Sequence, residues 1–217
     1  MRVNVDLRVL ELLASRVCHD LISPVGAIGN GLELIEEGGD AEMTGEALKL
    51  SINCVRRASA ILEFFRMAYG AAGSGGALSW DGARALAAGL VEGSRVTLSW
   101  TPPPTGLTLP AGTAKLALNM VLLAAEMLPR GGEVRVSLEP TPGRLAVAVT
   151  ATGQDAKVPA EIAAVLAAGG AAEAAGLTAK TVHGYFTARL ADAFGGRLEL
   201  AALPPTSVRL STALALG

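Results

Sequence analysis

The stretch Ala14-Ser-Arg-Val-Cys-His-Asp-Leu-Ile-Ser-Pro-Val-Gly-Ala-Ile-Gly-Asn-Gly-Leu-Glu-Leu34 decides the fold of the first part of this chain. Taking every seventh residue around it gives an apolar series, Leu7, Ala14, Leu21, Ile28 and Ile35. The companion series is Leu10, Val17, Pro24 and Gly31. This heptad spacing is typical of a long helix that packs along one seam. It predicts a helix from about Val5 to Glu37, weakened at Pro24 and Gly31.

A second long helix is predicted from about Ala41 to Tyr69. Gly38-Gly39-Asp40 would end the first helix and cap the next one. The apolar residues along one side of the second helix are Ala47, Leu50, Cys54, Ile61 and Phe65. Two long helices joined by a short turn form an antiparallel hairpin, which leaves one apolar face uncovered. Two copies pairing into a four-helix bundle would cover it, so we expect a homodimer.

The composition changes after the hairpin, at Gly70-Ala-Ala-Gly-Ser-Gly-Gly76, which is typical of a flexible linker. We therefore expect two domains, residues 1–72 and residues 78–217. In the second domain, short β-rich runs alternate with helical segments. Helices are expected at 79–91, 112–128, 159–168 and 178–193, and strands at 95–100, 133–139, 144–151, 197–200 and 207–215. The predicted fold class is α+β, a hairpin followed by an α/β sandwich with helices on one face of a mixed, mainly antiparallel sheet.

The composition argues against several classes of protein. The formal net charge is −2, and Lys and Arg are scattered, so neither a nucleic-acid surface nor a basic membrane patch is expected. Cys18 and Cys54 have no CxxC spacing and are expected to be reduced, partly buried helix residues rather than metal ligands. The start of the chain lacks the apolar run of a signal peptide, and 116–128 is too short to span a bilayer. We expect a cytoplasmic protein.

His19 falls at heptad position f, the position that faces away from the seam. Its neighbours Ser15, Arg16, Asp20 and Ser23 are polar, so the ring is expected to be exposed. An exposed imidazole is partly neutral near pH 7, and the neutral ring is a nucleophile. The Asp20 carboxylate could accept the N–H of one ring nitrogen and leave the other free to attack phosphorus. From the residues alone, a solvated surface histidine and a phosphoacceptor stay equally open.

Pro24 and the glycines after His19 are expected to shape the same region. Proline cannot donate the helical hydrogen bond to the Asp20 carbonyl, so a kink or loosened turn is expected just after the histidine. Gly26, Gly29 and Gly31 would continue that loosening and let a partner helix approach closely.

The same stretch resembles the H-box of histidine kinases, in which a His, an acidic residue and a later Pro mark the phosphoacceptor. In detail Cys18-His-Asp-Leu-Ile-Ser-Pro-Val25 is most similar to the histidine phosphotransferases of alphaproteobacteria, and the resemblance extends over both halves of the chain. It implies that His19 is phosphorylated, that Asp20 orients and activates it, and that the hairpin is the dimerisation and phosphotransfer domain. It also implies contacts with a receiver domain one turn to either side of His19, at Ser15, Arg16, Ile22, Ser23 and Gly26.

The second half resembles the ATP-binding domain of histidine kinases with its nucleotide contacts altered. Asn119 matches the first asparagine of the kinase N-box, whereas Leu123 stands at the second. Ala151 stands where the kinases have the adenine-binding Asp, and Asp155 replaces a glycine and would repel phosphates. Of the glycine-rich G2 box only Gly176-Leu177 remains. Each missing hydrogen bond costs roughly 1–3 kcal/mol, so no ATP binding is expected; ATP bound in an altered way is the alternative.

The resemblance implies a cell-cycle phosphorelay. His19 would take a phosphoryl group from the receiver domain of a CckA-like hybrid histidine kinase and pass it to CtrA-like and CpdR-like response regulators. Mg²⁺ is expected in the partner receiver, and this chain is expected to need no metal or cofactor of its own. Two alternatives stay open, namely a non-catalytic dimeric module that sequesters receivers and an ATP-dependent histidine kinase.

Three further residues carry weaker predictions. His183 lies inside the helix expected at 178–193 and has no acidic neighbour, so we expect it to have a structural role. Arg56 and Arg57 on the second helix could meet the acidic pocket of a receiver. A solvated helix face is the favoured interpretation for both, because exposed arginines on helices are common.

Overall fold

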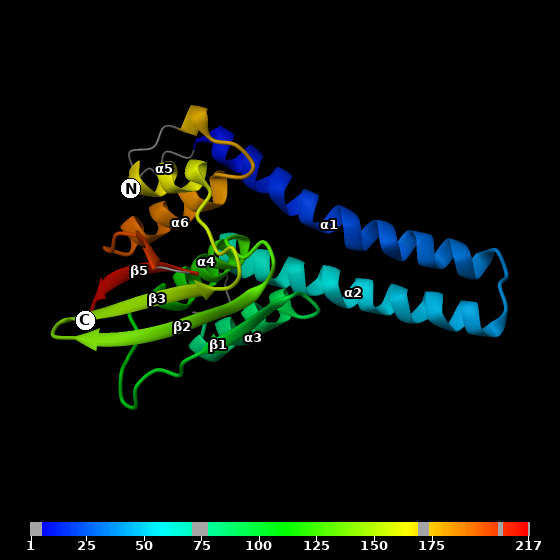
Figure 1. Ribbon diagram of the computed structural model, residues 1–217, viewed down its shortest axis with the longest axis horizontal. Helices are drawn as coiled ribbons and strands as arrows, with labels where there is room; N and C mark the ends of the chain where they lie inside the picture. Colours follow the sequence, from blue (N-terminus) through cyan, green and yellow to red (C-terminus); the bar gives the residue numbers. More distant parts are fainter. Residues whose placement is uncertain (1–5, 71–77, 169–173, 204–205, 217) are drawn as a thin grey trace.

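The computed structural model describes residues 6–70, 78–168, 174–203 and 206–216, and places a long helical hairpin beside a layered α/β domain (Figure 1). The hairpin consists of α1 (Leu7–Glu36) and α2 (Ala41–Tyr69). Asp6 and Asp40 cap the two helices, and their carboxylates accept the backbone N–H of Arg8 and Met43, each at 2.8 Å. The two predicted helices are confirmed. The loosened turn expected after His19 does not break α1, which stays helical through Pro24.

Gly31 of α1 is buried against α2. A Cβ atom at this position would collide with the Ser51 hydroxyl and press on the Ala47 carbonyl, so any larger residue would require α2 side chains or backbone to shift. At the start of α1, the first residues of the heptad series do not pack against α2. Leu7 and Leu10 are exposed in the single chain, because α1 there turns the face carrying Leu12 and Leu13 toward the second domain.

The second domain contains five strands, with the helices α3 (Trp80–Val91), α4 (Thr113–Glu126), α5 (Ala160–Ala168) and α6 (Val182–Ala193), and the short 3-10 helix η2 (Ala174–Gly176). The strands are β1 (Val96–Trp100), β2 (Gly132–Thr141), β3 (Arg144–Thr152), β4 (Glu199–Leu203) and β5 (Ser207–Ala215). Their order is β1-β2-β3-β5-β4. β1 pairs with β2 in parallel, and the other pairs are antiparallel. The predicted mixed, mainly antiparallel sheet is therefore confirmed.

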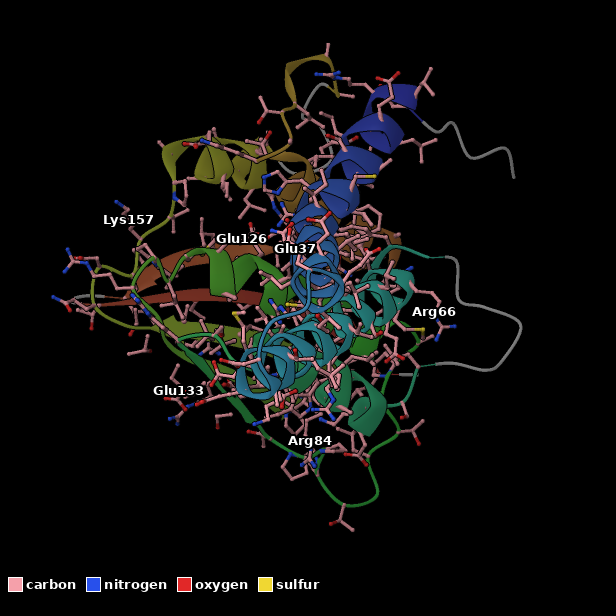
Figure 2. The ribbon with its side chains drawn as sticks, turned by 90° about the vertical axis from the view of Figure 1, so that its right-hand side faces the viewer. Glu37, Arg66, Arg84, Glu126, Glu133 and Lys157 are labelled. Atoms are coloured by element: carbon pink, nitrogen blue, oxygen red, sulfur yellow. The ribbon has the colours of Figure 1, made fainter. Side chains whose placement is uncertain are left out.

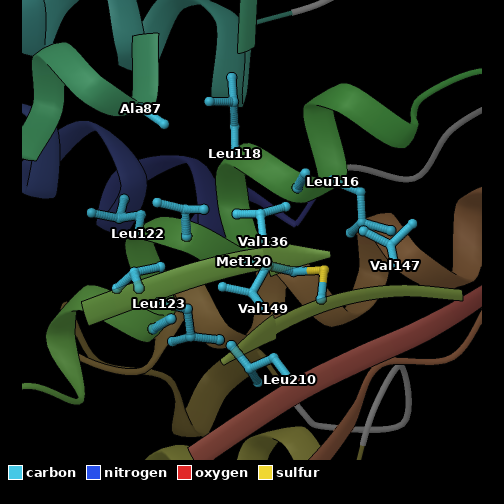
Figure 3. Close-up of a cluster of buried hydrophobic side chains, with 14 of the residues drawn as sticks. Ala87, Leu116, Leu118, Met120, Leu122, Leu123, Val136, Val147, Val149 and Leu210 are labelled. Atoms are coloured by element: carbon cyan, nitrogen blue, oxygen red, sulfur yellow. The ribbon is translucent and has the colours of Figure 1, made fainter. Parts of the chain in front are cut away.

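Helix α4 forms the centre of the core, between the sheet and the helices α2 and α3 (Figure 3). One side of α4 packs Leu116, Met120 and Leu123 over the strands, and all three side chains are fully buried. The strand residues that meet this layer include Val136, Val147, Val149 and Leu210. Each such side chain stabilises the fold by about 1.5–3 kcal/mol relative to its exposed state. The apolar sequence of α4 therefore follows from burial on nearly every side.

The open end of the hairpin is embedded in the second domain, whereas its turn projects away from it (Figure 1). From α2, Phe64, Phe65 and Ala68 join the same core as α4. From α1, Leu12 and Leu13 pack with Leu177 and Val182 in a smaller cluster. The hairpin and the second domain therefore meet through apolar contacts from both helices.

The predicted linker falls mainly at residues 71–77, outside the described residues, and the domain limits at 72 and 78 stay a prediction. Tyr69 ends α2 and Trp80 begins α3 on either side of it. Across the described ranges, no helix has the length and apolar character needed to cross a membrane.

Candidate functional site

His19 lies on α1 one turn after Arg16, and 86% of its side chain is exposed. Its Nδ1 lies 3.1 Å from Oδ1 of Asp20. A carboxylate can only accept a hydrogen bond, so Nδ1 carries the proton and donates it to Asp20. The lone pair is then on Nε2, which makes Nε2 the nucleophilic atom of the ring.

His19 borders a groove of about 1350 Å³ between the hairpin and the second domain. One wall comes from α1 and α2, and includes Ser15, Asp20, Ser23, Asn53 and Arg56. The other wall comes from the end of α3 and the loop after it (89–94), the end of α4 at Glu126, and Ala179-Lys180. The groove therefore depends on how the two parts of the chain are held together.

Arg16, one turn before His19, is bound to the second domain. Its guanidinium forms an ion pair with Glu126 at the end of α4, and only 12% of the Arg16 side chain is exposed. Figure 2 shows Glu126 beside α1. Nothing in the sequence indicated this contact, because it joins residues 110 positions apart. Its contact with a receiver stays a prediction.

The other predicted docking residues are exposed but do not all lie together. Ser15 and Ser23 line the groove with His19. Ile22 and Gly26 are also exposed, yet they lie on α1 outside the groove lining. The structure therefore brings two of these side chains to the groove and leaves two on the adjoining helix surface.

Arg57 does not lie on a solvated helix face as favoured from the sequence. Its Nη1 donates to the carbonyls of Leu90 and Gly89, the second at 3.5 Å, at the end of α3. A cation at a helix C-terminus is favourable because the last carbonyls carry partial negative charge. Arg56 is exposed and lines the groove, so it is the arginine of this pair that a partner could meet.

The two cysteines are free, and neither belongs to a metal-binding group. Cys54 is half-buried in the groove wall, as expected. Cys18 is exposed, so its predicted partial burial is wrong, because it lies on the outward face of α1. Within the described part of the chain, no three His, Cys, Asp or Glu side chains come together in a way that could hold a metal ion.

Sequence reasoning missed a buried polar network behind the groove. His183, predicted to be structural, is fully buried and binds at both ring nitrogens, to the Tyr69 hydroxyl at 3.0 Å and the Asn119 backbone carbonyl at 2.9 Å. Burial lowers the pKa of His183 to about 3, with the nearby positive charge of Arg16 acting in the same direction. Burial also raises the pKa of Tyr69. Both groups are therefore neutral near pH 7.

The positions that correspond to the nucleotide-binding residues of histidine kinases hold buried apolar side chains or polar groups bonded to other residues of the chain. Leu123 and Ala151 are fully buried in the hydrophobic core. Asp155 is exposed, and its carboxylate lies 3.1 Å from Nε of Arg130. The Asn119 amide nitrogen donates to carbonyls of the chain itself, while its Oδ1 is buried with no partner among the described residues.

The match to a family model and the similarity to a curated relative show that the chain belongs to the histidine phosphotransferase family. Residues 80–204 match the model of the histidine phosphotransferase C-terminal domain. The protein phosphotransferase ChpT of Brucella abortus (strain 2308) is 37% identical over 204 residues, which cover 92% of this chain and 94% of that protein. A solved bacterial phosphotransferase is 33% identical with a TM-score of 0.80, covering 97% of this chain and 98% of that one. The histidine kinase AdeS of Acinetobacter baumannii is 14% identical with a TM-score of 0.48, covering 92% and 98%.

Proposed function

Because the chain belongs to the histidine phosphotransferase family, we propose that it relays a phosphoryl group through His19 between the receiver domains of other proteins. The observation that carries this proposal is the exposed His19 ring beside a groove, with its Nδ1 held 3.1 Å from the Asp20 carboxylate. A docking surface alone needs no such imidazole. A nucleophile needs a free nitrogen and a partner for the other one.

The chemistry consists of two reversible in-line transfers. The Nε2 lone pair attacks the phosphorus of an aspartyl phosphate in the donor receiver, and the P–O bond breaks with its electron pair leaving on the aspartate carboxylate. Nδ1 keeps its proton and donates its hydrogen bond to the Asp20 carboxylate, whose negative charge offsets the positive charge that develops on the ring. An acceptor aspartate then attacks the phosphorus, and the P–Nε2 bond breaks. Mg²⁺ in the receiver neutralises the phosphoryl oxygens, so this chain contributes mainly position.

The partners we propose are receiver domains that dock on the α1 surface around His19. Ser15 and Ser23 offer hydroxyl groups on this surface, and Arg56 adds a positive charge at the groove wall. By the family resemblance the donor is a CckA-like hybrid histidine kinase, the acceptors are CtrA-like and CpdR-like regulators, and the relay operates in the cytoplasm. Both phosphorylated and free receivers are acidic at their active sites, which suits a basic residue such as Arg56.

We also propose that the hairpin forms a homodimer. Among the described residues, every large exposed hydrophobic side chain except Leu203 lies on α1 or α2. One stripe runs along each helix at helical spacing, with Leu7, Val25 and Leu32 on α1 and Leu48, Ile52, Val55 and Leu62 on α2. Exposed apolar residues that follow the helical repeat on both helices of a hairpin are covered when two copies pair as a four-helix bundle.

The phosphoryl source we propose is a receiver and not ATP. Leu123 and Ala151 are buried apolar residues where the kinase resemblance calls for polar contacts to the nucleotide. The Asn119 amide nitrogen donates to two backbone carbonyls within the chain, and the side chain is fully buried. Both observations support a domain that has lost its nucleotide site and serves as a scaffold.

Phosphate transfer separates the relay from its two alternatives. The experiment incubates the full chain, or its His19→Ala variant, with a receiver domain carrying labelled phosphate, and in parallel with labelled ATP. A relay predicts label on the wild type from the receiver only. Label from ATP would make the chain a kinase, and receiver binding without any label would make it a docking module.

A further inference from the structure

The last residues of α2 are all held by hydrogen bonds from the second domain. The Asn119 side-chain amide donates to the Ala68 carbonyl at 3.0 Å, and the Lys115 ammonium donates to the Gly70 carbonyl at 2.5 Å. Between these two, the Tyr69 hydroxyl lies 3.0 Å from Nδ1 of His183. Three consecutive positions at the end of the phosphotransfer hairpin are therefore bound to α4 and α6.

The direction of each hydrogen bond follows from the chemistry of its partners. A backbone carbonyl only accepts, so Nε2 of His183 carries the proton and donates to the Asn119 carbonyl at 2.9 Å. Nδ1 then holds a lone pair and accepts the Tyr69 hydroxyl proton. The bonds close a ring through Ala68, Asn119, His183 and Tyr69. Because His183 is fully buried and stays neutral, the ring keeps this pattern near neutral pH.

These bonds constrain the hairpin in a way that apolar packing does not. The last carbonyls of a helix have no partner within the helix, and here side chains of another domain supply partners for two of them. The apolar contacts of Phe64 and Phe65 with the core favour burial but are not directional. Hydrogen bonds fix distance and angle, so the ring and the Lys115 bond fix how α2 enters the second domain.

A change of angle at the end of α2 would be magnified along the helix at the groove beside His19. Arg57 lies twelve residues before Tyr69, a distance of about 18 Å along a helix. A tilt of roughly 5° at the Tyr69 end would move this wall of the groove by about 1.5 Å, and displacements near 1 Å can already cost a hundredfold in rate. A small change of angle at the far end of α2 would therefore produce a large displacement of the groove wall beside His19.

We propose that Asn119, His183 and Lys115 are positioning residues for phosphotransfer, which set the width of the groove beside His19 by fixing the end of α2. The proposal rests on the relay function and names a role for the second domain within it. Two contacts nearer the site, Arg16 with Glu126 and Arg57 with the end of α3, join the same two parts of the chain. The second domain is then a brace that holds the docking surface in one shape.

The test uses the full chain and removes one hydroxyl group. Tyr69→Phe deletes the bond to His183 but keeps the aromatic ring, which stacks on Phe65 with centroids 5.0 Å apart. The matched control is Tyr185→Phe on α6, whose hydroxyl has no hydrogen-bond partner in the described ranges. Lys115→Met is a second, independent variant that removes the ammonium group and with it the bond to Gly70, and keeps an unbranched side chain of similar length. Thermal unfolding establishes that each variant is folded.

Three readouts are compared for each variant. The rate of amide hydrogen exchange measures how often the last turn of α2 opens, and this measurement does not require the chain to transfer phosphate. Transfer from a phospho-receiver gives KM and kcat. Loading of His19 from phosphoramidate, a small phosphoryl donor, needs the imidazole but not the groove.

The brace predicts that Tyr69→Phe and Lys115→Met each speed exchange in the last turn of α2 by about threefold to tenfold, the effect of one lost hydrogen bond. It predicts a higher KM for the phospho-receiver with phosphoramidate loading unchanged, and no effect of Tyr185→Phe. Two results would overturn the proposal. One is an unchanged rate of amide exchange in the last turn of α2 in both variants. The other is a loss of transfer from the phospho-receiver that is no greater than the loss of loading from phosphoramidate. If the wild type accepts phosphate from neither donor, the proposed relay is wrong. The exchange data still show whether these hydrogen bonds fix the end of α2.

Discussion

Arg16 of α1 and Glu126 of α4 form an ion pair that joins α1 to the second domain one turn from His19. The two side chains are only 12% and 28% exposed, so water screens their charges less than those of a surface pair. The Nε of Arg16 is buried with no partner among the described residues, which leaves Glu126 as the group that offsets its charge. The helix that carries His19 is thus joined to the second domain close to His19, in addition to the apolar contacts of Leu12 and Leu13 nearer its start.

Removing the Glu126 charge should destabilise the protein. Glu126→Gln leaves the Arg16 guanidinium largely buried without an anion, and we expect the free energy of unfolding to fall by about 1–3 kcal/mol. Equilibrium unfolding in urea measures this change in the free energy of unfolding. The matched control is Glu133→Gln, which breaks an exposed pair with Arg135 and should cost less than about 0.5 kcal/mol. Equal effects of the two variants would show that the Arg16–Glu126 pair contributes no more than a surface pair.

Asp20 should act on the rate of transfer and not on receiver binding. Asp20→Asn keeps an oxygen that can accept from Nδ1 of His19 but removes the negative charge that offsets charge on the ring. A hydrogen bond to a charged group is worth about 1.5–3 kcal/mol, so we expect kcat for transfer to fall roughly tenfold to a hundredfold. Single-turnover transfer and a separate binding titration measure the two effects.

The control for this variant is Asp192→Asn on α6, which removes the same charge far from the site. It should leave transfer unchanged. A weaker binding of the receiver to Asp20→Asn, with the rate of bound transfer intact, would instead make Asp20 a docking residue.

A charge on the exposed stripe of α1 should prevent dimerisation. Val25→Glu places a carboxylate on the apolar surface of the hairpin, where pairing of two copies would bury it. We expect dimer affinity to fall on the order of a hundredfold or more, because an unpaired buried charge costs several kcal/mol. Light scattering across a dilution series measures the molar mass of the particles in solution and so the fraction of dimer. Leu203→Glu, at an exposed apolar residue of β4, should leave the mass unchanged, and a Val25→Glu dimer of wild-type strength would contradict this interface.

Acid should weaken the fold through His183. Its pKa is lowered to about 3 in the folded chain, below the ordinary value of 6.5, so between these values the unfolded chain binds the additional proton. Stability from this residue is therefore present above pH 6.5 and falls as the pH drops, by about 2 kcal/mol between pH 7 and pH 5. His183→Gln should remove that part of the pH dependence in urea unfolding. His19→Ala, a matched loss of one histidine, should retain it; identical slopes in wild type and His183→Gln would refute the assignment.

Much of the fold follows from local patterns in the sequence. The heptad series and Gly38-Gly39-Asp40 predicted both long helices, because apolar spacing and capping residues act over a few neighbouring positions. Alternating apolar residues predicted the strands for the same reason. The exposure of His19 also followed, since a residue at position f points away from the seam whatever covers the other faces.

The features that were missed depend on contacts between distant residues. The heptad describes one seam, but α1 has a face toward α2, a face toward the second domain and an uncovered face. Burial of Leu12 and Leu13 and the pairing of Arg16 follow from that arrangement. Asn119 was interpreted through its motif position, and no local signal links it to Ala68, which is 51 residues away.

The most direct test of the relay asks which atom carries the phosphoryl group. The full chain, labelled with ¹⁵N in its histidines, is phosphorylated by a receiver domain and its imidazole signals are followed by NMR. Because Asp20 holds Nδ1, the account predicts a phosphorus–nitrogen bond at Nε2 of His19, an unmodified His183, and no phosphohistidine signal in His19→Ala. Phosphate on Nδ1 of His19, on another residue, or on the His19→Ala variant would contradict it.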